Sequence, residues 1–472
     1  MTRDRLVPLI VAVALFMENM DSTVIATSLP AIAADIGTSP LTLKLAVTSY
    51  LLSLAVFIPI SGWTADRFGA RTVFRAAIGV FVLGSIGCAL SGSLAQFVFA
   101  RIVQGVGGAM MSPVGRLVLL RTIDRRALVG AMAWVSVPAM IGPLLGPPLG
   151  GLITTYATWH WIFIINVPMG LVGIALVTRY IEDVRAQVRE RFDFVGMILS
   201  GLGVAGLTFG LSVAGFDLLP WPIVVSIIAT GAVSLALYLA YAHRAPAPVL
   251  DFKLLAFPTF RASLIGGFLF RIGVGAIPFL LPLLLQVGFG FTPFHSGLIT
   301  FTSTMGALFM KPVASRVLKE FGFRNVLTAN AILSALFIAA CALFSATTPV
   351  AIMIGVLLVG GFFRSLQFTS VNALAYAEVP VERMSRATSL ASVGQQVSLA
   401  TGVAIGALAV EMVLRLKGQP TITAADFPAA FILVGAVTAL STVLFARLPT
   451  QAGAEMADRA SAPATTSSQG MS

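Results

Sequence analysis

The stretch Pro138–Gly151, which reads PAMIGPLLGPPLGG, places four glycines and four prolines inside an otherwise apolar run. In water such a segment would not hold a helix, whereas in a bilayer neighbouring helices can satisfy the freed backbone groups. Its small residues form two stripes with a spacing of four, namely Pro138, Gly142, Gly146 and Gly150, and beside them Pro143, Pro147 and Gly151. The stripes predict a membrane helix against which another helix lies almost backbone to backbone.

The composition of the whole chain agrees with a membrane environment. Hydrophobic residues make up 57% of the 472 residues, charged residues only 10%, and the mean hydropathy is +0.95. That leaves too little polar surface for a soluble globule of this length. Windows of about 20 apolar residues, enough to cross ~30 Å of hydrocarbon, lie at residues 6–28, 45–65, 73–92, 95–115, 129–153, 161–178, 194–215, 221–241, 262–285, 295–315, 325–345, 349–374, 387–411 and 427–446. The sequence predicts an all-α polytopic membrane protein with fourteen transmembrane helices.

The basic residues are distributed unevenly between the two sides of the predicted membrane. The net charge of +11 could indicate a nucleic-acid partner, but 24 of the 30 Lys and Arg lie in the two tails, in the loops on the same side as the tails, or in the ends of spans next to those loops. The opposite side holds three, Lys44, Arg415 and Lys417, and the spans hold Arg101, Arg271 and Arg364. By the positive-inside rule both termini are predicted to be cytoplasmic, and no nucleic-acid partner is expected.

Two features of the sequence bear on processing and compartment. The N-terminal run after Arg5 resembles a secretory signal peptide, but Glu18 and Asp21 inside it favour a first transmembrane helix. Cys88 and Cys341 fall in different spans, so they predict packing residues and no disulfide framework.

The chain repeats itself over about half its length. Phe68–Arg71 (FGAR) returns as Phe321–Arg324 (FGFR) at an offset of 253, and Ile123–Arg125 (IDR) returns as Val381–Arg383 (VER) at an offset of 258. The first stripe of small residues maps onto Gly394, Ser398, Gly402 and Gly406 at an offset of 256. Such duplication predicts two six-helix bundles of parallel topology, related by an axis along the membrane normal.

Four regions follow from this repeat. Residues 1–181 are predicted to form the N-terminal six-helix bundle, and residues 246–448 the C-terminal one. Residues 182–245, a charged loop and two spans without a counterpart in the repeat, are predicted to be inserted linker helices. Residues 449–472, rich in Ala, Ser and Thr, are predicted to be a disordered cytoplasmic tail.

Five motifs in register carry a resemblance to a known family: Met20–Val24 (MDSTV), Gly62–Arg71 (GWTADRFGAR), Arg101–Gly108 (RIVQGVGG), the doubled stripe that contains Gly142, Pro143, Gly146, Gly150 and Gly151, and Trp159–Phe163 (WHWIF) with Asn166 and Pro168. The chain resembles the fourteen-helix drug:proton antiporter family of the major facilitator superfamily, and is similar to its bacterial MdtD-like branch. The doubled stripe is similar to the antiporter motif of these exporters. The resemblance implies the major-facilitator fold and proton-coupled efflux.

The loop after the second span combines glycines with charged residues. The glycines permit a tight turn, and Asp66 can pair with arginines or with a helix N-terminus across the interface between the bundles. The resemblance implies that this segment is a gate that opens and closes during transport, formed by Gly62, Asp66, Arg67, Gly69 and Arg71. Alternatively, its arginines serve only as topology anchors.

The fourth span has a polar face of small residues. Arg101, Gln104, Gly105, Gly108 and Ser112 fall within an arc of about 100° at 100° per residue. This face is predicted to line a cavity or to contact an acid on a neighbouring helix. Its glycines do not form a nucleotide loop, because no strand precedes them.

Charges inside the spans indicate the mechanism, since each costs about 2.5–3.5 kcal/mol at mid-helix. Asp21, with Arg101 as its counter-charge, is predicted to take up and release the coupling proton. Glu18 and Asp21 are three residues apart and share one face of the first span. The predicted substrate cavity comprises Glu18, Gln104, Arg271 and Arg364, with Arg271 reaching it from the second bundle. The alternative for Asp21 and Arg101 is a static structural ion pair.

Enzyme hypotheses find no support in the motifs. The three histidines are scattered over loops, there is no H-E-x-x-H, and no G-x-x-x-x-G-K-[ST] provides an ATP site. No catalytic residue, metal or cofactor is therefore expected, and energy must come from an ion gradient. We predict a bacterial inner-membrane exporter of drugs or other amphipathic small molecules that exchanges them for protons by alternating access. Its partners would be substrate, protons and the lipid bilayer, and it would work as a monomer.

Two alternatives stay open at this level. Arg271 and Arg364 have no acid of their own within the ninth to twelfth spans, which favours an exporter of an anionic metabolite such as a carboxylate. A channel or facilitator is the other class, and counterflow separates it from an exporter, because a channel shows no exchange-accelerated uptake.

Overall fold

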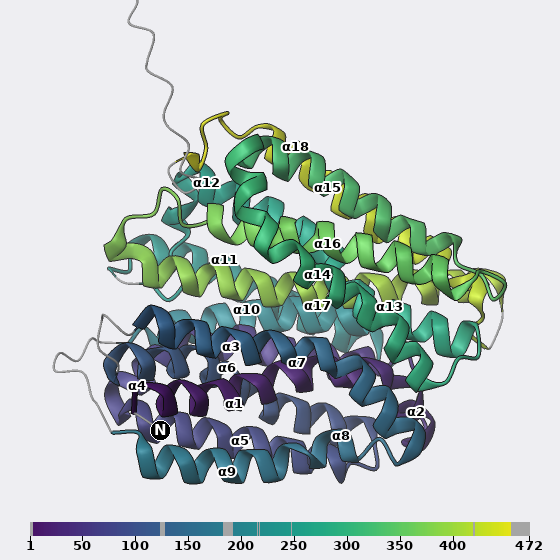
Figure 1. The fold of residues 1–472 in the computed structure, drawn as a ribbon, viewed down its shortest axis with the longest axis horizontal. Coiled ribbons are helices and arrows are strands. Elements are labelled where there is room, and N and C mark those ends of the chain that lie inside the picture. The colour runs from purple at the N-terminus through teal and green to yellow at the C-terminus, as the bar shows by residue number, and fades with distance from the viewer. Residues whose placement is uncertain are drawn as a thin grey trace, which may run out of the picture.

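The computed structural model describes residues 3–122, 128–182, 192–214, 216, 218–246, 248–418 and 421–454, and within these ranges it contains helices and no β-strand. The first half forms α1 (Arg3–Val24), α2 (Leu29–Asp35), α3 (Lys44–Phe57), α4 (Ser61–Phe68), α5 (Ala70–Ala89), α6 (Leu94–Thr122), α7 (Leu128–Tyr156), α8 (Trp161–Ile164) and α9 (Asn166–Tyr180). The second half forms α12 (Pro258–Arg261), α13 (Gly267–Leu283), α14 (Pro293–Phe321), α15 (Phe323–Ala340), α16 (Val350–Leu374), α17 (Met384–Lys417) and α18 (Pro428–Ala446). Figure 1 shows the two halves as two layers of roughly parallel helices.

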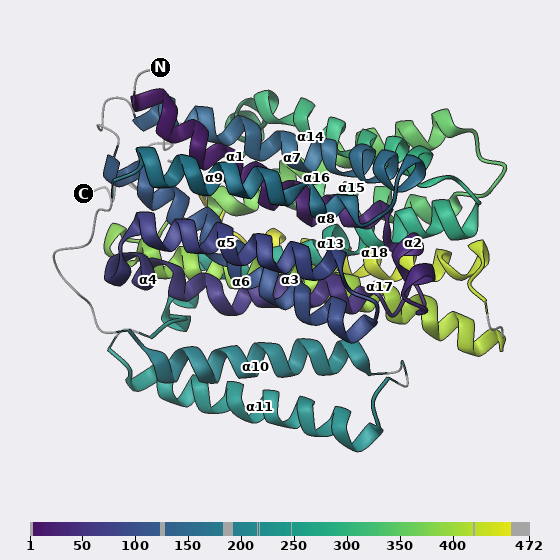
Figure 2. The ribbon, with the colours of Figure 1, turned by 90° about the horizontal axis from the view of Figure 1, so that it is seen from below.

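A helical hairpin lies between the halves in sequence and beside them in space. It consists of α10 (Phe194–Val213) and α11 (Trp221–Arg244). Figure 2 shows both helices outside the two layers, where α10 contacts α3 of the first half and α17 of the second. The hairpin therefore covers one edge of the seam between the halves.

The helices coincide with the fourteen apolar windows of the sequence. Among the described residues, twelve helices are long and apolar enough to cross a membrane. The windows at 129–153 and 295–315 correspond to α7 and α14, which are 29 residues long but are not among those twelve. The all-helical membrane fold is confirmed, whereas fourteen crossings and the boundaries of the four regions stay predictions. Most of the predicted tail, residues 455–472, lies outside the described residues, as do Ile123–Arg125 of the repeat.

Two glycine turns reflect the internal repeat. Gly69 joins α4 to α5 with a φ of 94°, and Gly322 joins α14 to α15 with a φ of 75°. Residues with a Cβ rarely adopt this backbone conformation, so glycine is required at both turns. The same turn thus recurs at the offset of 253 found in the sequence.

The glycines of α7 allow close contact with two different helices. A Cβ at Gly142 would lie 2.9 Å from the backbone oxygen of Phe16 in α1, and a Cβ at Gly146 or Gly150 would overlap α1 as well. A Cβ at Gly151 would instead overlap the backbone of Pro293 at the start of α14. The backbone-to-backbone packing expected from the sequence is therefore present on both sides of α7, within the first half and across to the second.

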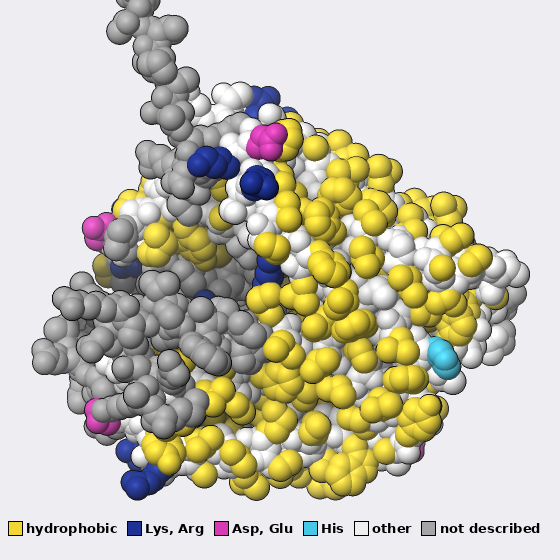
Figure 3. Space-filling model, in the orientation of Figure 1, with side chains coloured by type: hydrophobic (Ala, Val, Ile, Leu, Met, Phe, Trp, Pro, Cys, Tyr) yellow, Lys and Arg dark blue, Asp and Glu magenta, His cyan; other side chains and the backbone are white. Residues whose placement is uncertain are grey.

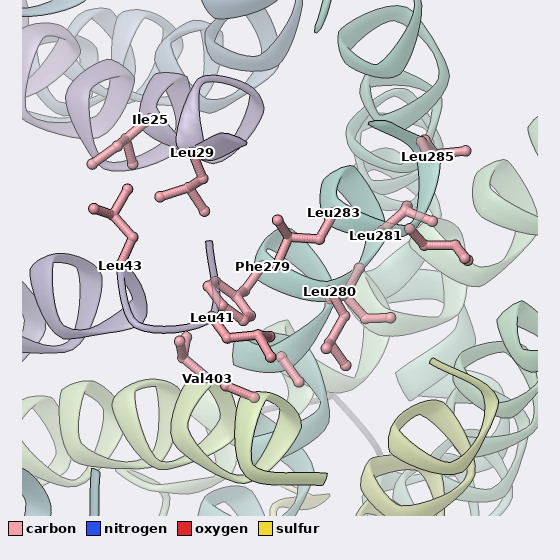
Figure 4. Close-up of a cluster of buried hydrophobic side chains, with 14 of the residues drawn as sticks. Ile25, Leu29, Leu41, Leu43, Phe279, Leu280, Leu281, Leu283, Leu285 and Val403 are labelled. Atoms are coloured by element: carbon pink, nitrogen blue, oxygen red, sulfur yellow. The ribbon is translucent and has the colours of Figure 1, made fainter. Parts of the chain in front are cut away.

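One end of the molecule is closed by an apolar cluster drawn from both halves. Figure 4 shows Ile25, Leu29, Leu41 and Leu43 of the first half facing Phe279, Leu280, Leu281, Leu283, Leu285 and Val403 of the second. Gln286 Nε2 also donates a hydrogen bond of 2.9 Å to Thr27 O, which joins the halves at the same place. We call this the closed end.

The opposite end carries the start of α1 and the end of α18. On the face drawn in Figure 3 hydrophobic side chains cover most of the surface, as expected for a lipid-facing belt, and Lys and Arg gather toward this second end. Toward the same end the surface is hollowed between the two halves.

Lys44 does not lie in an exposed loop, as its place between two spans suggested. It begins α3, its side chain is fully buried, and its Nζ lies 3.3 Å from the centroid of the Phe216 ring. The other two basic residues predicted on this side form ion pairs, Arg415 with Glu411 and Lys417 with Asp426. A residue that hydropathy assigns to a loop, such as Lys44, can thus be buried, because the bundle and the hairpin cover it.

Candidate functional site

A buried ion pair joins α1 and α6 in the interior of the first half. Arg101 Nη1 lies 2.7 Å from Asp21 Oδ2, and the side chains are 1% and 0% exposed, respectively. The predicted partners therefore meet directly. Because both charges are withdrawn from solvent, removing either one would leave the other uncompensated in an apolar interior.

Two amides complete the hydrogen bonding of the Asp21 carboxylate. Gln104 Nε2 donates to Asp21 Oδ1 at 2.8 Å, and Asn166 Nδ2 donates to the same oxygen at 2.9 Å. Both amides also donate to Ser85 Oγ, at 2.7 Å and 3.1 Å. The acid is thus held by α6 and α9 together, with α5 supporting the amides.

Asn166 and Ser85 were not identified as site residues from the sequence. Asn166 belongs to a motif that carried the family resemblance, but the motif assigned it no role. Ser85 is one of many serines in apolar spans, and nothing in its spacing separates it from a packing residue. Asn166 could have been found from the sequence, because an amide side chain that is buried at the start of a span requires a hydrogen-bonding partner.

The guanidinium of Arg101 is held on its other sides as well. Its Cζ lies 4.2 Å from the centroid of the Tyr50 ring, and Nη1 also donates to Gln104 Oε1 at 2.6 Å. Nε donates to Ala46 O at 3.4 Å. A guanidinium that is stacked on a ring and held by several hydrogen bonds keeps one orientation. Arg101 can therefore form and break its ion pair with Asp21 without turning away.

Glu18 lies about one turn from Asp21 along α1 and has a different environment. It is partly exposed, and Ser112 Oγ of α6 donates a hydrogen bond of 3.0 Å to Glu18 Oε2. Arg101, Gln104 and Ser112 therefore all face α1, as expected from their shared side of the helix. The site holds one sealed carboxylate and one accessible carboxylate.

The arginines of the second half hydrogen-bond within that half, and their place in a shared substrate cavity stays a prediction. The Nη2 of Arg271 donates to Asn372 Oδ1 of α16 at 2.7 Å. Arg364 donates to Ser303 Oγ of α14. Each guanidinium thus bonds to a residue of its own half, because α13, α14 and α16 pack against one another there.

The loop between α4 and α5 also differs from expectation. Asp66 forms an ion pair with Arg121 at the end of α6, within the first half and not across the interface. Arg67 is exposed and Arg71 is half-buried. Nothing lies within 4 Å of a Cβ placed at Gly62, so close packing does not require that glycine, whereas the positive φ of Gly69 does require one.

Pro143 is half-buried in α7 beside the contact of Gly142 with α1.

In the part of the chain that the structure describes, no group of three or more His, Cys, Asp or Glu side chains could hold a metal ion.

Two apolar helical halves that meet at one end, with an ion pair buried inside one of them, define a polytopic membrane transporter. The model of the Major Facilitator Superfamily matches residues 11–242 and 263–468, and the chain belongs to this superfamily, whose members are transporters and not enzymes.

Two curated relatives from Salmonella carry the same name. The chain is 40% identical over 452 residues to "Putative multidrug resistance protein MdtD" of Salmonella paratyphi B, covering 93% of this chain and 94% of that protein. The protein of the same name from Salmonella typhimurium is also 40% identical, over 456 residues, with the same coverage.

Solved structures share the fold at low sequence identity. A crystal structure of a D-xylose-proton symporter has a TM-score of 0.68 at 14% identity, covering 95% of this chain and 98% of that one. A POT family transporter in complex with 5-aminolevulinic acid has a TM-score of 0.66 at 16% identity, covering 92% and 94%.

Proposed function

We propose that this transporter exports drugs or other amphipathic small molecules in exchange for protons, by alternating access, across the bacterial inner membrane. The relatives named as multidrug resistance proteins support the substrate class. The distribution of Lys and Arg supports an orientation with both termini in the cytoplasm. The protein would act as a monomer, with substrate, protons and lipid as its partners.

The observation that carries the proposal is the Asp21 network. A carboxylate that is fully buried and held by Arg101, Gln104 and Asn166 has two alternative states. In one it is charged and paired, and in the other it is protonated and releases the guanidinium. Because the network joins α1 to α6 and α9, a change in the protonation of Asp21 alters contacts among three helices, which links proton binding to helix movement.

The closed end supports alternating access. In the proposed orientation the apolar cluster seals the side away from the cytoplasm, and the hollow between the halves opens toward the cytoplasm. Transport would require the cluster to separate while the opposite ends of the halves approach each other. The ion pair of Asp66 with Arg121 then belongs to the cytoplasm-open state, and the gate would form when the loop after α4 meets the second half.

The direct test is transport into everted membrane vesicles that contain the full-length protein. Acidification of the vesicle interior should drive accumulation of a lipophilic cation such as ethidium, and nigericin should abolish the accumulation by collapsing ΔpH. Vesicles without the protein are the control. Accumulation that is insensitive to ΔpH, together with the absence of counterflow, would favour the channel alternative.

The proposed orientation predicts opposite labelling of two cysteines in a variant without Cys88 and Cys341. Leu90 is exposed between α5 and α6, and Gln451 is exposed after α18. An impermeant maleimide added to spheroplasts should label Leu90→Cys at once, and Gln451→Cys only after permeabilisation. The reverse pattern would place the termini outside and contradict the orientation.

A further inference from the structure

The spans of the second half contain two arginines that form no ion pair with a carboxylate of the described residues. Arg271 is 4% exposed, and its Nη2 has the amide oxygen of Asn372 as acceptor, while its Nε is buried without any hydrogen-bond partner. Arg364 donates to the Ser303 hydroxyl. In contrast, Arg101 of the first half has its own acid. The two halves therefore differ in charge compensation.

The two guanidiniums are connected by a stripe along α16. Arg364, Phe368 and Asn372 follow one another at a spacing of four, so they lie on one side of the helix. The Cζ of Arg271 lies 5.4 Å from the centroid of the Phe368 ring. The ring of Phe368 thus lies between the guanidinium of Arg271, which bonds to Asn372, and that of Arg364 at the other end of the stripe.

This stripe faces the interior of the protein. Val359 and Ile352 of α16 are exposed on the lipid-facing side. Phe368 follows Val359 by nine residues, which corresponds to a rotation of about 180° at 100° per residue. Phe368, Asn372 and Arg364 are nonetheless partly exposed, so the stripe is not sealed by the neighbouring helices.

A buried guanidinium that lacks a counter-charge is unfavourable, and a carboxylate accepts its hydrogen bonds more strongly than an amide oxygen does. We propose that Arg271 binds the carboxylate of an amphipathic anionic substrate, with Phe368 contacting its apolar body and Arg364 as the second cation of the site. Asn372 holds the place of the substrate carboxylate until the substrate binds. This inference rests on the proposed transport function and specifies a substrate class for it.

The test measures binding to the purified full-length protein in detergent, by calorimetry and by thermal unfolding. Benzoate and benzamide serve as a matched pair, since they share an aromatic ring and differ in charge. Benzoate should bind and raise the unfolding temperature, and benzamide should do neither. Arg271→Gln should weaken benzoate binding roughly tenfold or more, the loss expected when a hydrogen bond to a charged group is removed. Arg261→Gln, which removes an exposed arginine of the same half, should bind as the wild type does.

Asn372→Asp separates loss of binding from loss of folding. It places a resident carboxylate at the atom that already accepts from Arg271 at 2.7 Å. The variant should unfold at a higher temperature than the wild type and yet lose benzoate binding, because the new acid occupies the guanidinium. The proposal is overturned if the wild-type protein binds benzoate no better than benzamide, or if Asn372→Asp and Arg271→Gln both retain wild-type affinity.

These outcomes are distinguishable from failure of the proposed function. The binding measurement uses no proton gradient, whereas the vesicle assay with ethidium needs no anion. If the protein exports ethidium under ΔpH but does not bind benzoate, only the proposal of an anion site is refuted. A protein that binds benzoate through Arg271 but shows no ΔpH-dependent transport refutes the coupling alone.

Discussion

Asp21→Asn is expected to reduce ΔpH-driven accumulation in everted vesicles to the level of vesicles without the protein, while downhill exchange of substrate persists. The amide keeps the size of the side chain and can still accept a hydrogen bond from Arg101, but it can neither carry a charge nor bind the coupling proton. The wild-type carboxylate is held by three donors in a sealed interior. In the variant, therefore, neither a water molecule nor a solvent ion can take over its charge or its proton. Ethidium accumulation and counterflow, measured on the same vesicles, separate coupling from translocation.

Asp35→Asn is the matched control, because this acid lies at the end of α2 and its side chain is 55% exposed. It should leave the accumulation unchanged. If Asp21→Asn still builds a gradient at the wild-type rate, the coupling proton binds elsewhere. Glu18 would then be the next carboxylate to replace, since it is partly exposed and accepts a hydrogen bond from Ser112.

Gly297→Leu is expected to prevent the closed end from forming and to abolish export. A Cβ at Gly297 of α14 would overlap the backbone oxygen of Pro147 in α7, where the two halves meet. Overpacking costs about 1–3 kcal/mol, and backbone atoms cannot move aside as a flexible side chain can. A cost of that size, applied to one of two conformations, changes their ratio by roughly 5- to 150-fold. The population should therefore move toward the state that is open on the side away from the cytoplasm.

A cysteine at Leu41 reports this shift. Leu41 is 1% exposed in the apolar cluster, so Leu41→Cys should react slowly with an impermeant maleimide in spheroplasts and faster when combined with Gly297→Leu. Gly355→Leu is the control, because nothing lies within 4 Å of a Cβ at that glycine of α16. Equal labelling rates with and without Gly297→Leu, accompanied by normal export, would show that this contact does not hold the closed end together.

The membrane class and the placement of the helices were predictable from the sequence. Apolar windows identify spans because the bilayer requires about 20 apolar residues for each crossing, whatever the neighbouring helices are. The glycine stripes of α7 were informative for a similar reason, since a face without side chains can be read from spacing alone. Gly142 and Gly151 indeed approach backbone atoms of α1 and α14.

The pairing of Asp21 with Arg101 was predictable because charges within spans are few and costly. The sequence did not identify Asn166 and Ser85, which hold the same acid, because serines and amides occur in spans for several reasons.

The sequence by itself determined which segments form membrane helices and which sides of those helices are polar or small, because both properties depend on composition and a fixed rotation per residue. Only the tertiary structure decided the partners of these side chains. Asp66 pairs with Arg121 of its own half, Arg271 bonds to Asn372, and Lys44 is buried over Phe216. The physical reason is that a partner depends on how each helix is rotated and placed against its neighbours, and packing among many side chains sets that arrangement.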